Sequence, residues 1–259
     1  MNINDATAVY MGATEVTKLY LGATEAWNAI PPVPVVIQSV DTGHTFYPYV
    51  GGATTINTSI TGVTAGSSLI FVIIGDCEAG SFAHSLTDPV GSTWNKLLEH
   101  VVVAWGGNDR TGETIYFAEN VDAGDHPFTI TGFTGGLMGI AILEVLNVSG
   151  IVASGVAGVA SDSGGPPTAM NVTSSGNVPA GETLVLGIGV FTASVPNPGV
   201  INGTGGWTDR HVGGHEHIGG LVQSTTLFSD GSSPVTWTAN RPTGGGPTKG
   251  WVSAVVAFQ

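Results

Sequence analysis

The segment Trp105-Gly106-Gly107-Asn108-Asp109-Arg110 gathers the residue types that a sugar-binding site uses. An aromatic ring stacks on the C–H face of a pyranose, while carboxylate, amide and guanidinium groups form hydrogen bonds with its hydroxyls. Trp105 would supply the platform, and Asn108, Asp109 and Arg110 would supply the hydrogen bonds. Ordinary packing of the Trp105 ring is the competing interpretation.

Other tryptophans have positions that indicate packing. Trp94, Trp207 and Trp237 occur in strand-like runs or at repeated positions, so we predict that they are core residues. Trp251 opens the last apolar run and fits either role.

A second candidate is the histidine-rich run from Arg210 to His217, which contains His211, His215 and His217. On a β-strand, residues two apart point to the same side, so His215 and His217 can reach one metal ion. The pair resembles the His-X-His device that holds iron on the axis of some trimeric phage fibres. Solvated histidines on a polar strand or loop are the favoured alternative, and we predict no metal and no other cofactor.

A third candidate, Asp162-Ser163-Gly164-Gly165-Pro166, resembles the nucleophile segment of chymotrypsin-type serine proteases. The resemblance implies Ser163 as nucleophile, with a histidine base and a buried aspartate upstream. Ser161 stands where that family has Gly, and the nearest counterpart of its Ala-Ala-His-Cys element, residues 82–85, matches poorly. A connecting loop is the favoured interpretation. The sequence contains no phosphate-binding loop, nucleophile elbow or zinc-protease motif, and we predict that the protein is not an enzyme.

A repeated motif near the start of the chain predicts small elements of its own. The run Val9-Tyr10-Met11-Gly12-Ala13-Thr14-Glu15-Val16 returns as Leu19-Tyr20-Leu21-Gly22-Ala23-Thr24-Glu25-Ala26. Each copy predicts a short apolar strand ending in a Gly-Ala-Thr turn, as in a small β-meander. Strands this short are not stable alone, so we expect the arm to dock on a larger body. The residues expected in that contact are Tyr10, Gly12, Tyr20, Gly22 and Trp27.

Tandem Tyr-Leu-Gly-Ala-Thr-Glu units of this kind resemble the N-terminal segments of tailed-bacteriophage virion proteins, especially tail fibres and related adhesins. The resemblance covers residues 4–27. It implies an arm that anchors the protein to other virion proteins, and a final location in the virion after synthesis in the host cytoplasm.

The composition restricts both the fold and the partners. The chain has 259 residues with 40 Gly, 14 Pro and 10% charged residues, which favours short strands joined by turns over a helical bundle. A net charge of −13 with 6 Lys and Arg disfavours nucleic acid and anionic membranes as partners. Cys77 is single and no basic-then-apolar leader opens the chain, so we expect neither an intramolecular disulfide nor a secretory signal.

The nearly uncharged stretch 135–160 is not predicted to insert into a membrane, because the carboxylate of Glu144 lies inside it. This stretch instead predicts a buried strand over Met138–Leu146, followed by a loop of small residues.

Three prolines within residues 30–34 indicate an extended spacer. We therefore divide the chain into an anchoring arm (1–30), a linker (31–34) and a β body (35–259). The body contains a faint duplication, with pseudo-repeats over about 50–150 and 168–259. The supporting matches, in chain order, are 65–69 with 180–184, 94 with 207, 114–117 with 225–228, 128–131 with 235–238, and 141–145 with 254–258.

Each half supplies about five strands, which is typical of an all-β sandwich or jelly roll. The runs 69–74, 137–143 and 252–258 are apolar at successive positions, so both of their faces must be covered. The cover can come from the other half, the arm or neighbouring subunits. We expect a homo-oligomer, with a trimer favoured, and keep mutual covering of the halves within a monomer as the alternative.

The sequence thus predicts a non-enzymatic virion protein whose body binds a receptor, with a bacterial surface glycan as the expected ligand and several copies adding avidity. Two alternatives remain. One is a head fibre, capsid decoration or tail-tip scaffold that binds no receptor, and the other is a hydrolase acting on host envelope polymers.

Overall fold

The computed structural model divides the chain into two compact units, Met1–Val33 and Pro34–Gln259. The backbone is described for residues 9–11, 14–16, 18–21, 24–28, 32–47, 54–77, 82, 84–103, 110–133, 136–159, 169–193, 201–215, 218–240 and 248–259, and residues 9–28 and several strand ends are described by backbone alone. Every regular element in these ranges is a β-strand. The predicted all-β fold is therefore confirmed.

The small unit contains two antiparallel hairpins. β1 (Val9–Met11) pairs with β2 (Thr14–Val16), and β3 (Lys18–Leu21) pairs with β4 (Thr24–Asn28). Each copy of the repeated motif is one hairpin, with Tyr10 opposite Glu15 and Tyr20 opposite Glu25. The described strands thus form two separate two-stranded sheets rather than the single meander expected.

The structure does not test the anchoring contacts that the sequence predicts for this unit, so they stay predictions. Gly12 and Gly22 lie outside the described residues, and so do the side chains of Tyr10, Tyr20 and Trp27. Trp27 pairs with Leu19 across the second hairpin through the backbone.

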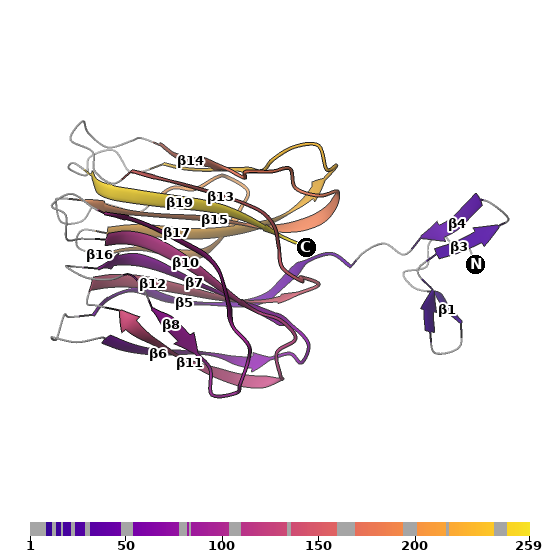
Figure 1. The fold of residues 1–259 in the computed structure, drawn as a ribbon, viewed down its shortest axis with the longest axis horizontal. Coiled ribbons are helices and arrows are strands. Elements are labelled where there is room, and N and C mark those ends of the chain that lie inside the picture. Colours follow the sequence, from indigo (N-terminus) through magenta and orange to yellow (C-terminus); the bar gives the residue numbers. More distant parts are fainter. Residues whose placement is uncertain are drawn as a thin grey trace. The chain divides into compact units, whose positions relative to one another are not determined.

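Two five-stranded antiparallel sheets form the centre of the large unit, stacked face to face (Figure 1). The first has the order β5-β12-β7-β10-β9, and the second has the order β13-β19-β15-β17-β16. The bounds in the first sheet are β5 Val35–Tyr47, β12 Gly136–Leu146, β7 Ser68–Cys77, β10 Arg110–Ala118 and β9 Asn95–Val103. Those in the second are β13 Ile151–Val159, β19 Thr248–Phe258, β15 Gly181–Ala193, β17 Ile218–Ser229 and β16 Thr208–His215.

Each central sheet carries a smaller sheet on its outer face. The first is covered by β6 (Thr54–Val63), β11 (Gly124–Phe133) and β8 (Ser85–Thr87). The second is covered by β14 (Ala169–Thr173) and β18 (Thr236–Asn240). Figure 1 shows β14 above the stack and β6, β8 and β11 below it. The body is a β-sandwich of four layers.

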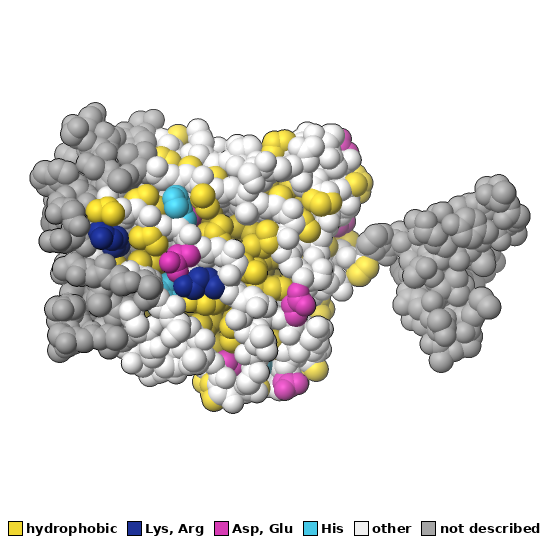
Figure 2. Space-filling model, viewed as in Figure 1, with side chains coloured by type: hydrophobic (Ala, Val, Ile, Leu, Met, Phe, Trp, Pro, Cys, Tyr) yellow, Lys and Arg dark blue, Asp and Glu magenta, His cyan; other side chains and the backbone are white. Residues whose placement is uncertain are grey.

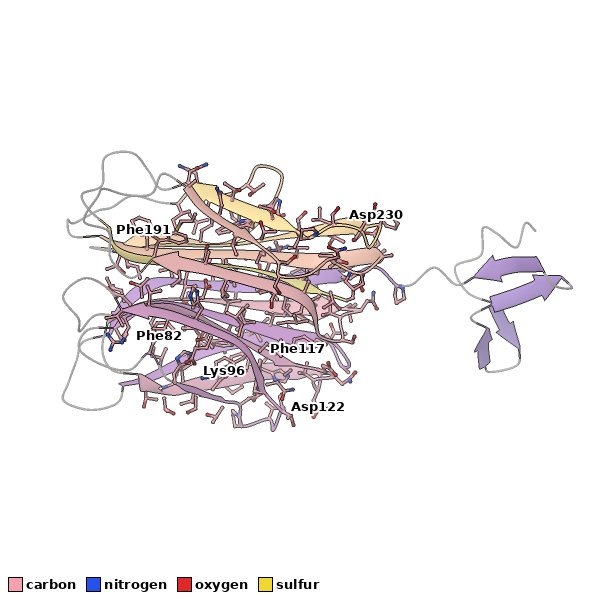
Figure 3. The ribbon with its side chains drawn as sticks, turned by 45° about the horizontal axis from the view of Figure 1, so that its top comes forward. Phe82, Lys96, Phe117, Asp122, Phe191 and Asp230 are labelled. Carbon is pink, nitrogen blue, oxygen red and sulfur yellow. The ribbon has the colours of Figure 1, made fainter. Side chains whose placement is uncertain are left out.

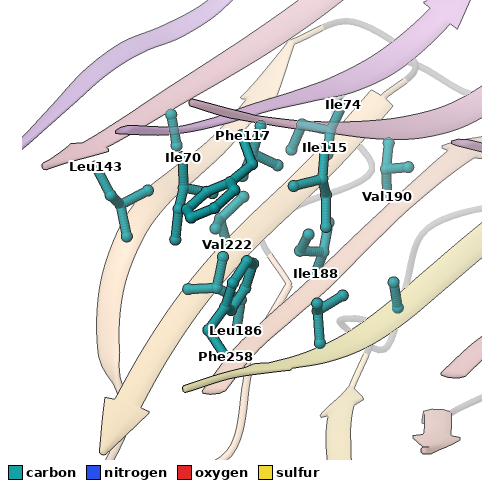
Figure 4. Packing of buried hydrophobic residues seen from close by; sticks show 14 of the residues in the cluster. Ile70, Ile74, Ile115, Phe117, Leu143, Leu186, Ile188, Val190, Val222 and Phe258 are labelled. Carbon is teal, nitrogen blue, oxygen red and sulfur yellow. The ribbon is translucent and has the colours of Figure 1, made fainter. Parts of the chain in front are cut away.

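Three hydrophobic clusters fill the spaces between these layers. The central cluster takes Ile70 and Phe117 from the first sheet and Leu186 and Phe258 from the second (Figure 4). The rings of Phe117 and Phe258 are 5.9 Å apart between centroids. Each such side chain contributes about 1.5–3 kcal/mol on burial, so this shared cluster binds the two halves together.

The four layers explain why the main strands are apolar at successive positions. Side chains alternate between the two faces of a strand, and both faces of β7 are buried. Ile70, Val72 and Ile74 enter the central cluster, whereas Leu69, Phe71 and Ile73 enter the outer one. The outer cover therefore comes from small sheets of the same chain, and this apolar pattern no longer argues for neighbouring subunits. The expected homo-oligomer stays a prediction.

The two halves of the body repeat one strand order. In the first half, β5 to β12 count as strands one to eight. In the second half, β13 to β15 count as strands one to three and β16 to β19 as strands five to eight. With this numbering the strand order of the central sheet is one, eight, three, six, five in both halves, and strand two pairs with strand seven in the outer sheet. The fourth strand, β8, corresponds in the second half to a single bridge between Asn202 and Asn240. β5 lies beside β16 at one edge of the sandwich and β9 beside β13 at the other, so the halves face each other with an approximate twofold relation.

The five pairs of matched segments lie on corresponding strands of the two halves, but not every pair faces the same kind of cluster. Segments 128–131 and 235–238 both face outer clusters, and segments 141–145 and 254–258 both alternate into the central one. Trp94 and Trp207 each precede the fifth strand and pack against the outer clusters.

In two of the pairs, the matched residues have different surroundings in the two halves. Leu69 faces an outer cluster but Leu184 faces the central one, because a shift of one residue exchanges the faces of a strand. Phe117 is buried, whereas Phe228 is 75% exposed.

The predicted strand over Met138–Leu146 is confirmed by β12, but the loop of small residues predicted after it is wrong. Residues 151–159 form β13. Its glycines permit close approach, since a Cβ on Gly155 would lie 2.1 Å from the carbonyl oxygen of Thr173, and one on Gly158 would lie 2.9 Å from the His100 ring. Small residues here serve tight packing of an edge strand and do not mark a loop.

The two ends of the body differ. At one end, here called the turn end, described turns over 64–67, 119–123, 147–150, 174–180 and 230–235 join the strands, and the chain leads into β5. At the opposite, loop end, strands β5, β7, β9, β13 and β15 lead into segments that lie outside the described residues. Figure 3 shows Asp122 and Asp230 at the turn end and Phe82 and Phe191 at the loop end.

Candidate functional site

The predicted sugar-binding loop follows the last residue of β9 at the loop end. Trp105, Asn108 and Asp109 lie outside the described residues. Arg110 is the first residue of β10, is partly exposed, and pairs across the sheet with Val103 and Cys77. The described strands β9 and β10 precede and follow residues 104–109, and the sugar-binding role of this segment stays a prediction.

The histidine run does not form a described metal site. The side chain of His215, at the end of β16, and all of His217 lie outside the described residues. His211 is buried, and its Nδ1 donates to Asp41 Oδ1 at 2.5 Å. Within the described part of the chain, no group of three His, Cys, Asp or Glu residues could hold a metal ion.

The His211–Asp41 pair connects the two central sheets, because His211 lies on β16 and Asp41 on β5. Burial raises the pKa of Asp41, but hydrogen bonds from His211 and the Gly43 N–H outweigh it and hold that pKa below its usual value. The pair is a structural link between the halves rather than a ligand set.

The predicted serine nucleophile is not described, since Asp162 and Ser163 lie outside the described residues. Elsewhere, Asp88, His126 and Ser92 bring the three residue types of a hydrolase triad together. Ser92 Oγ donates to Asp88 Oδ2 at 2.8 Å, and His126 Nδ1 donates to the same oxygen at 2.9 Å. His126 Nε2 donates to the Asp122 carbonyl at 2.8 Å, so the imidazole has no nitrogen left to act as base toward Ser92.

The His126 arrangement is instead a buried ion pair. Burial lowers the pKa of His126, but the Asp88 carboxylate and the Asp122 carbonyl raise it above its usual value overall. The pair ties the 88–94 segment to the start of β11.

Glu113 is a buried acid without a hydrogen-bond partner among the described residues. It lies in β10 on the face of Ile115, so its carboxyl group is between the central sheets. The closest described base is His100 Nδ1 on β9, 3.7 Å from Glu113 Oε1. Burial raises the pKa of Glu113 to about 7, against the opposing effect of His100.

Glu144 is equally buried but fully supported. Its Oε2 accepts a hydrogen bond from Gln38 Nε2 at 2.6 Å, and its Oε1 accepts one from the Thr64 N–H at 2.7 Å. Burial raises the pKa of Glu144, but these donors more than compensate, and the pKa lies below its usual value.

A cleft of about 480 Å³ opens at the turn end, between β17 and the turn over 230–235. Val178, Val185 and Val235, which belong to the outer cluster of the second sheet, line this cleft, and Phe228 and Asp230 also contribute to its lining. Leaving the Phe228 ring 75% exposed forfeits about 1.5–3 kcal/mol that burial would contribute. A cleft of this size with an exposed ring and a carboxylate is a candidate binding site.

Comparison with known proteins gives no relative: no family model, no curated protein and no solved structure matches this chain. Within the described residues, no helix has the length and apolar character to cross a membrane.

The sequence predictions missed Glu113, Glu144 as a hydrogen-bonded centre, and the Phe228 cleft. Glu144 was visible as a lone carboxylate in an apolar run, but its donors come from positions 38 and 64. Phe228 stands just before Ser229-Asp230-Gly231, and this local sequence does not show whether its ring is buried or exposed.

Proposed function

We propose that this protein is a structural component of a tailed-bacteriophage particle, of the tail-fibre or receptor-binding adhesin type, and that it is not an enzyme. The observation that carries this proposal is the division of the chain into a small unit of two repeated hairpins and a large body with two unlike ends. Two-stranded hairpins are marginal by themselves, which suits an arm that is completed by other virion proteins.

The polarity of the body supports the same function. The chain leads into β5 at the turn end, whereas the strands that flank residues 104–109 meet at the loop end. An adhesin anchored through its N-terminal arm would present the Trp105 loop away from its attachment point. Charged side chains are sparse on the face seen in Figure 2, with hydrophobic patches between them, which suits an uncharged glycan better than a polyanion.

Deletion of residues 1–27 tests the anchoring role. The truncated protein is expected to keep the cooperative unfolding transition of the body but to be absent from purified particles, whereas the full chain is present. A deletion of residues 1–16, which keeps the second hairpin, shows whether one repeat suffices. Normal incorporation of the 1–27 deletion would refute the anchoring role.

Glycan or host-cell binding tests the adhesin role. Trp105→Ala is expected to abolish binding, while Val103→Ala, at the exposed end of β9, serves as the matched control. A protein that joins particles but binds no host envelope glycan would be a decoration or scaffold protein. Release of reducing ends or peptides that stops with Ser163→Ala would instead make it a hydrolase.

A further inference from the structure

The last part of β17, residues 225–229, forms an open edge of the second central sheet. β15 pairs with these residues on one side. On the other side, β16 pairs with β17 only as far as Thr208, which lies opposite Ser224. Before Thr208 the chain turns away from this edge, and the Thr204 N–H donates to Gln223 Oε1 at 3.0 Å. No described strand therefore covers residues 225–229 on that side.

The first half of the body shows what fits at such an edge. There β10 corresponds to β17, and β9 pairs with it as far as Phe117, which lies opposite Asn95. Only Ala118, the last residue of β10, extends beyond that pairing. Phe117 is 2% exposed, whereas Phe228 is 75% exposed. An antiparallel strand therefore fills in one half the position that is left open in the other.

The open edge lacks the features that usually prevent strands from pairing. Exposed edges are commonly protected by Lys, by Pro or by a bulge. β9, itself an edge strand, has Lys96 and a register shift opposite Ile115 and Tyr116. Residues 225–229 read Thr-Thr-Leu-Phe-Ser, carry no charge and pair with β15 without a register shift. Their composition favours a further strand beside them.

Both faces of this edge expose apolar side chains. Successive residues of a strand point to opposite faces. On the outer face, Leu227 is 38% exposed and lines the cleft together with Val178. On the inner face is Phe228, and Thr226 Oγ1 donates to the Pro34 carbonyl at 3.4 Å, just before β5 begins. A strand added here would cover Leu227 on one face and Phe228 on the other.

We propose that this edge pairs antiparallel with the same edge of a second copy of the chain, about a twofold axis at Phe228. Directly opposite residues of antiparallel strands share a face, so the two Phe228 rings cover each other. Leu227 of each copy lies opposite Ser229 of the other, and Thr226 lies opposite Asp230, so no like charges meet. Thr225 stays outside the pairing and separates the added strand from β16.

The acidic residue closest in register to the axis does not oppose this contact. Glu182 lies opposite Phe228 on β15, one strand away from the axis strand. Across the joined sheets the two Glu182 residues are separated by three strand spacings, about 14 Å, which exceeds a Debye length of about 8 Å at physiological salt.

The contact also agrees with the polarity of the body. The open edge lies at the turn end, where the chain enters β5, so the pair would leave both loop ends uncovered. A twofold contact makes a dimer rather than the trimer that the sequence favours. This inference does not rest on the adhesin role, because it follows from the edge alone.

Sedimentation velocity on the full chain, from micromolar to near-millimolar concentration, tests the proposal. A reversible monomer–dimer equilibrium is expected, with a Kd in the micromolar to millimolar range because a short edge contact buries little surface. Phe228→Lys and Phe228→Asp each place like charges opposite one another and should weaken the dimer by about tenfold or more. An equimolar mixture of the two variants should associate again, because opposite charges then meet.

The matched control is Val212→Lys, at an exposed valine on the neighbouring edge strand β16, which should leave the Kd unchanged. Phe228→Cys should form a disulfide-linked dimer on mild oxidation, since opposite residues of paired strands have the Cα separation that a disulfide needs. Val212→Cys should not. Because Phe228 is largely exposed, its variants should unfold like the wild type, which separates lost association from lost fold.

Three results would overturn this interface. They are a protein that stays monomeric at every concentration, a dimer or trimer that Phe228→Lys leaves intact, and a mixture of the Lys and Asp variants that fails to associate although the wild type does. None of these would affect the glycan-binding and deletion tests of the adhesin role, so the two proposals can fail separately.

Discussion

Two glutamates of the same central sheet are both buried, and their surroundings differ completely. Glu144 on β12 and Glu113 on β10 lie on the two strands that flank β7, and neither side chain is exposed. Glu144 accepts hydrogen bonds from Gln38 and from the Thr64 backbone, whereas Glu113 has no hydrogen-bond partner among the described residues. The pKa of Glu144 is therefore lowered, and that of Glu113 is raised to about 7.

The difference teaches that hydrogen-bond donors, together with the depth of the carboxyl group, decide whether an unexposed carboxylate stabilises this fold. Glu144 faces the β6 side of the sheet, where the turn after β6 supplies a free backbone N–H. Glu113 faces the opposite central sheet and the hydrophobic central cluster, with His100 Nδ1 3.7 Å from its Oε1. One carboxylate is a structural cross-link, and the other is a destabilising group near its titration point.

The largest effect is expected from removing the supported carboxylate. Glu144→Ala leaves the Thr64 N–H and the Gln38 amide without their buried acceptor and should lower the free energy of unfolding by about 4 kcal/mol. Guanidinium titration at pH 7 measures this loss. A loss below about 1 kcal/mol would show that water replaces the carboxylate and would remove the contrast with Glu113.

Removing the unsupported carboxyl should have the opposite sign. A pKa that rises from 4.5 in the unfolded chain to about 7 in the fold corresponds to about 3 kcal/mol. The unfolded chain ionises first, so stability is complete below pH 4.5 and declines as the pH rises to about 7. Glu113→Gln, which cannot ionise, should match the wild type at pH 4 and be more stable by about 3 kcal/mol at pH 8.

The measurement for Glu113→Gln is the free energy of unfolding at several pH values from 4 to 8. Glu113→Asp is a useful companion, because it keeps the charge and should keep the slope with pH. An unchanged slope in Glu113→Gln would mean that His100 or water already supports the ionised form.

A smaller effect is expected when one of the two Glu144 donors is lost. Gln38→Ala removes the amide but leaves the Thr64 N–H, so the cost should be about 1–2 kcal/mol. The pKa of Glu144 should rise toward its usual value of 4.5, so the part of the stability that is lost on acidification below about that pH should become smaller than in the wild type. If Gln38→Ala costs as much as Glu144→Ala, the amide rather than the backbone supports this site.

The sequence was sufficient for the main features of the fold. Periodicity and composition gave an all-β body, and the continuous apolar runs correctly marked the strands buried on both faces. Trp237 was correctly placed in the core, where its ring lies so close to Gly187 that a Cβ there would be 2.2 Å from the indole. Those runs were visible because burial on both faces forces every position to be apolar.

The outer layers and the carboxylate environments were not predictable by the same reasoning. Ser85–Thr87 and Ala169–Thr173 are too short and too polar to stand out as strands, yet they belong to the outer sheets that cover the body. The hydrogen-bond donors of Glu144 come from residues 80 and 106 positions away in the sequence. The lack of hydrogen-bond donors around Glu113 depends on which side chains the facing sheet supplies. Such relations depend on tertiary packing, which local patterns do not encode.

Only four residues, Asn147 to Gly150, connect the two halves of the sandwich along the chain. Neither half can bury its inner face alone, yet each would find the same complementary face on another copy. A chain refolded at high concentration should therefore exchange halves with a neighbour and form interlocked dimers, while dilute refolding should favour self-closure. The brevity of that link makes the choice between the two a matter of concentration and time.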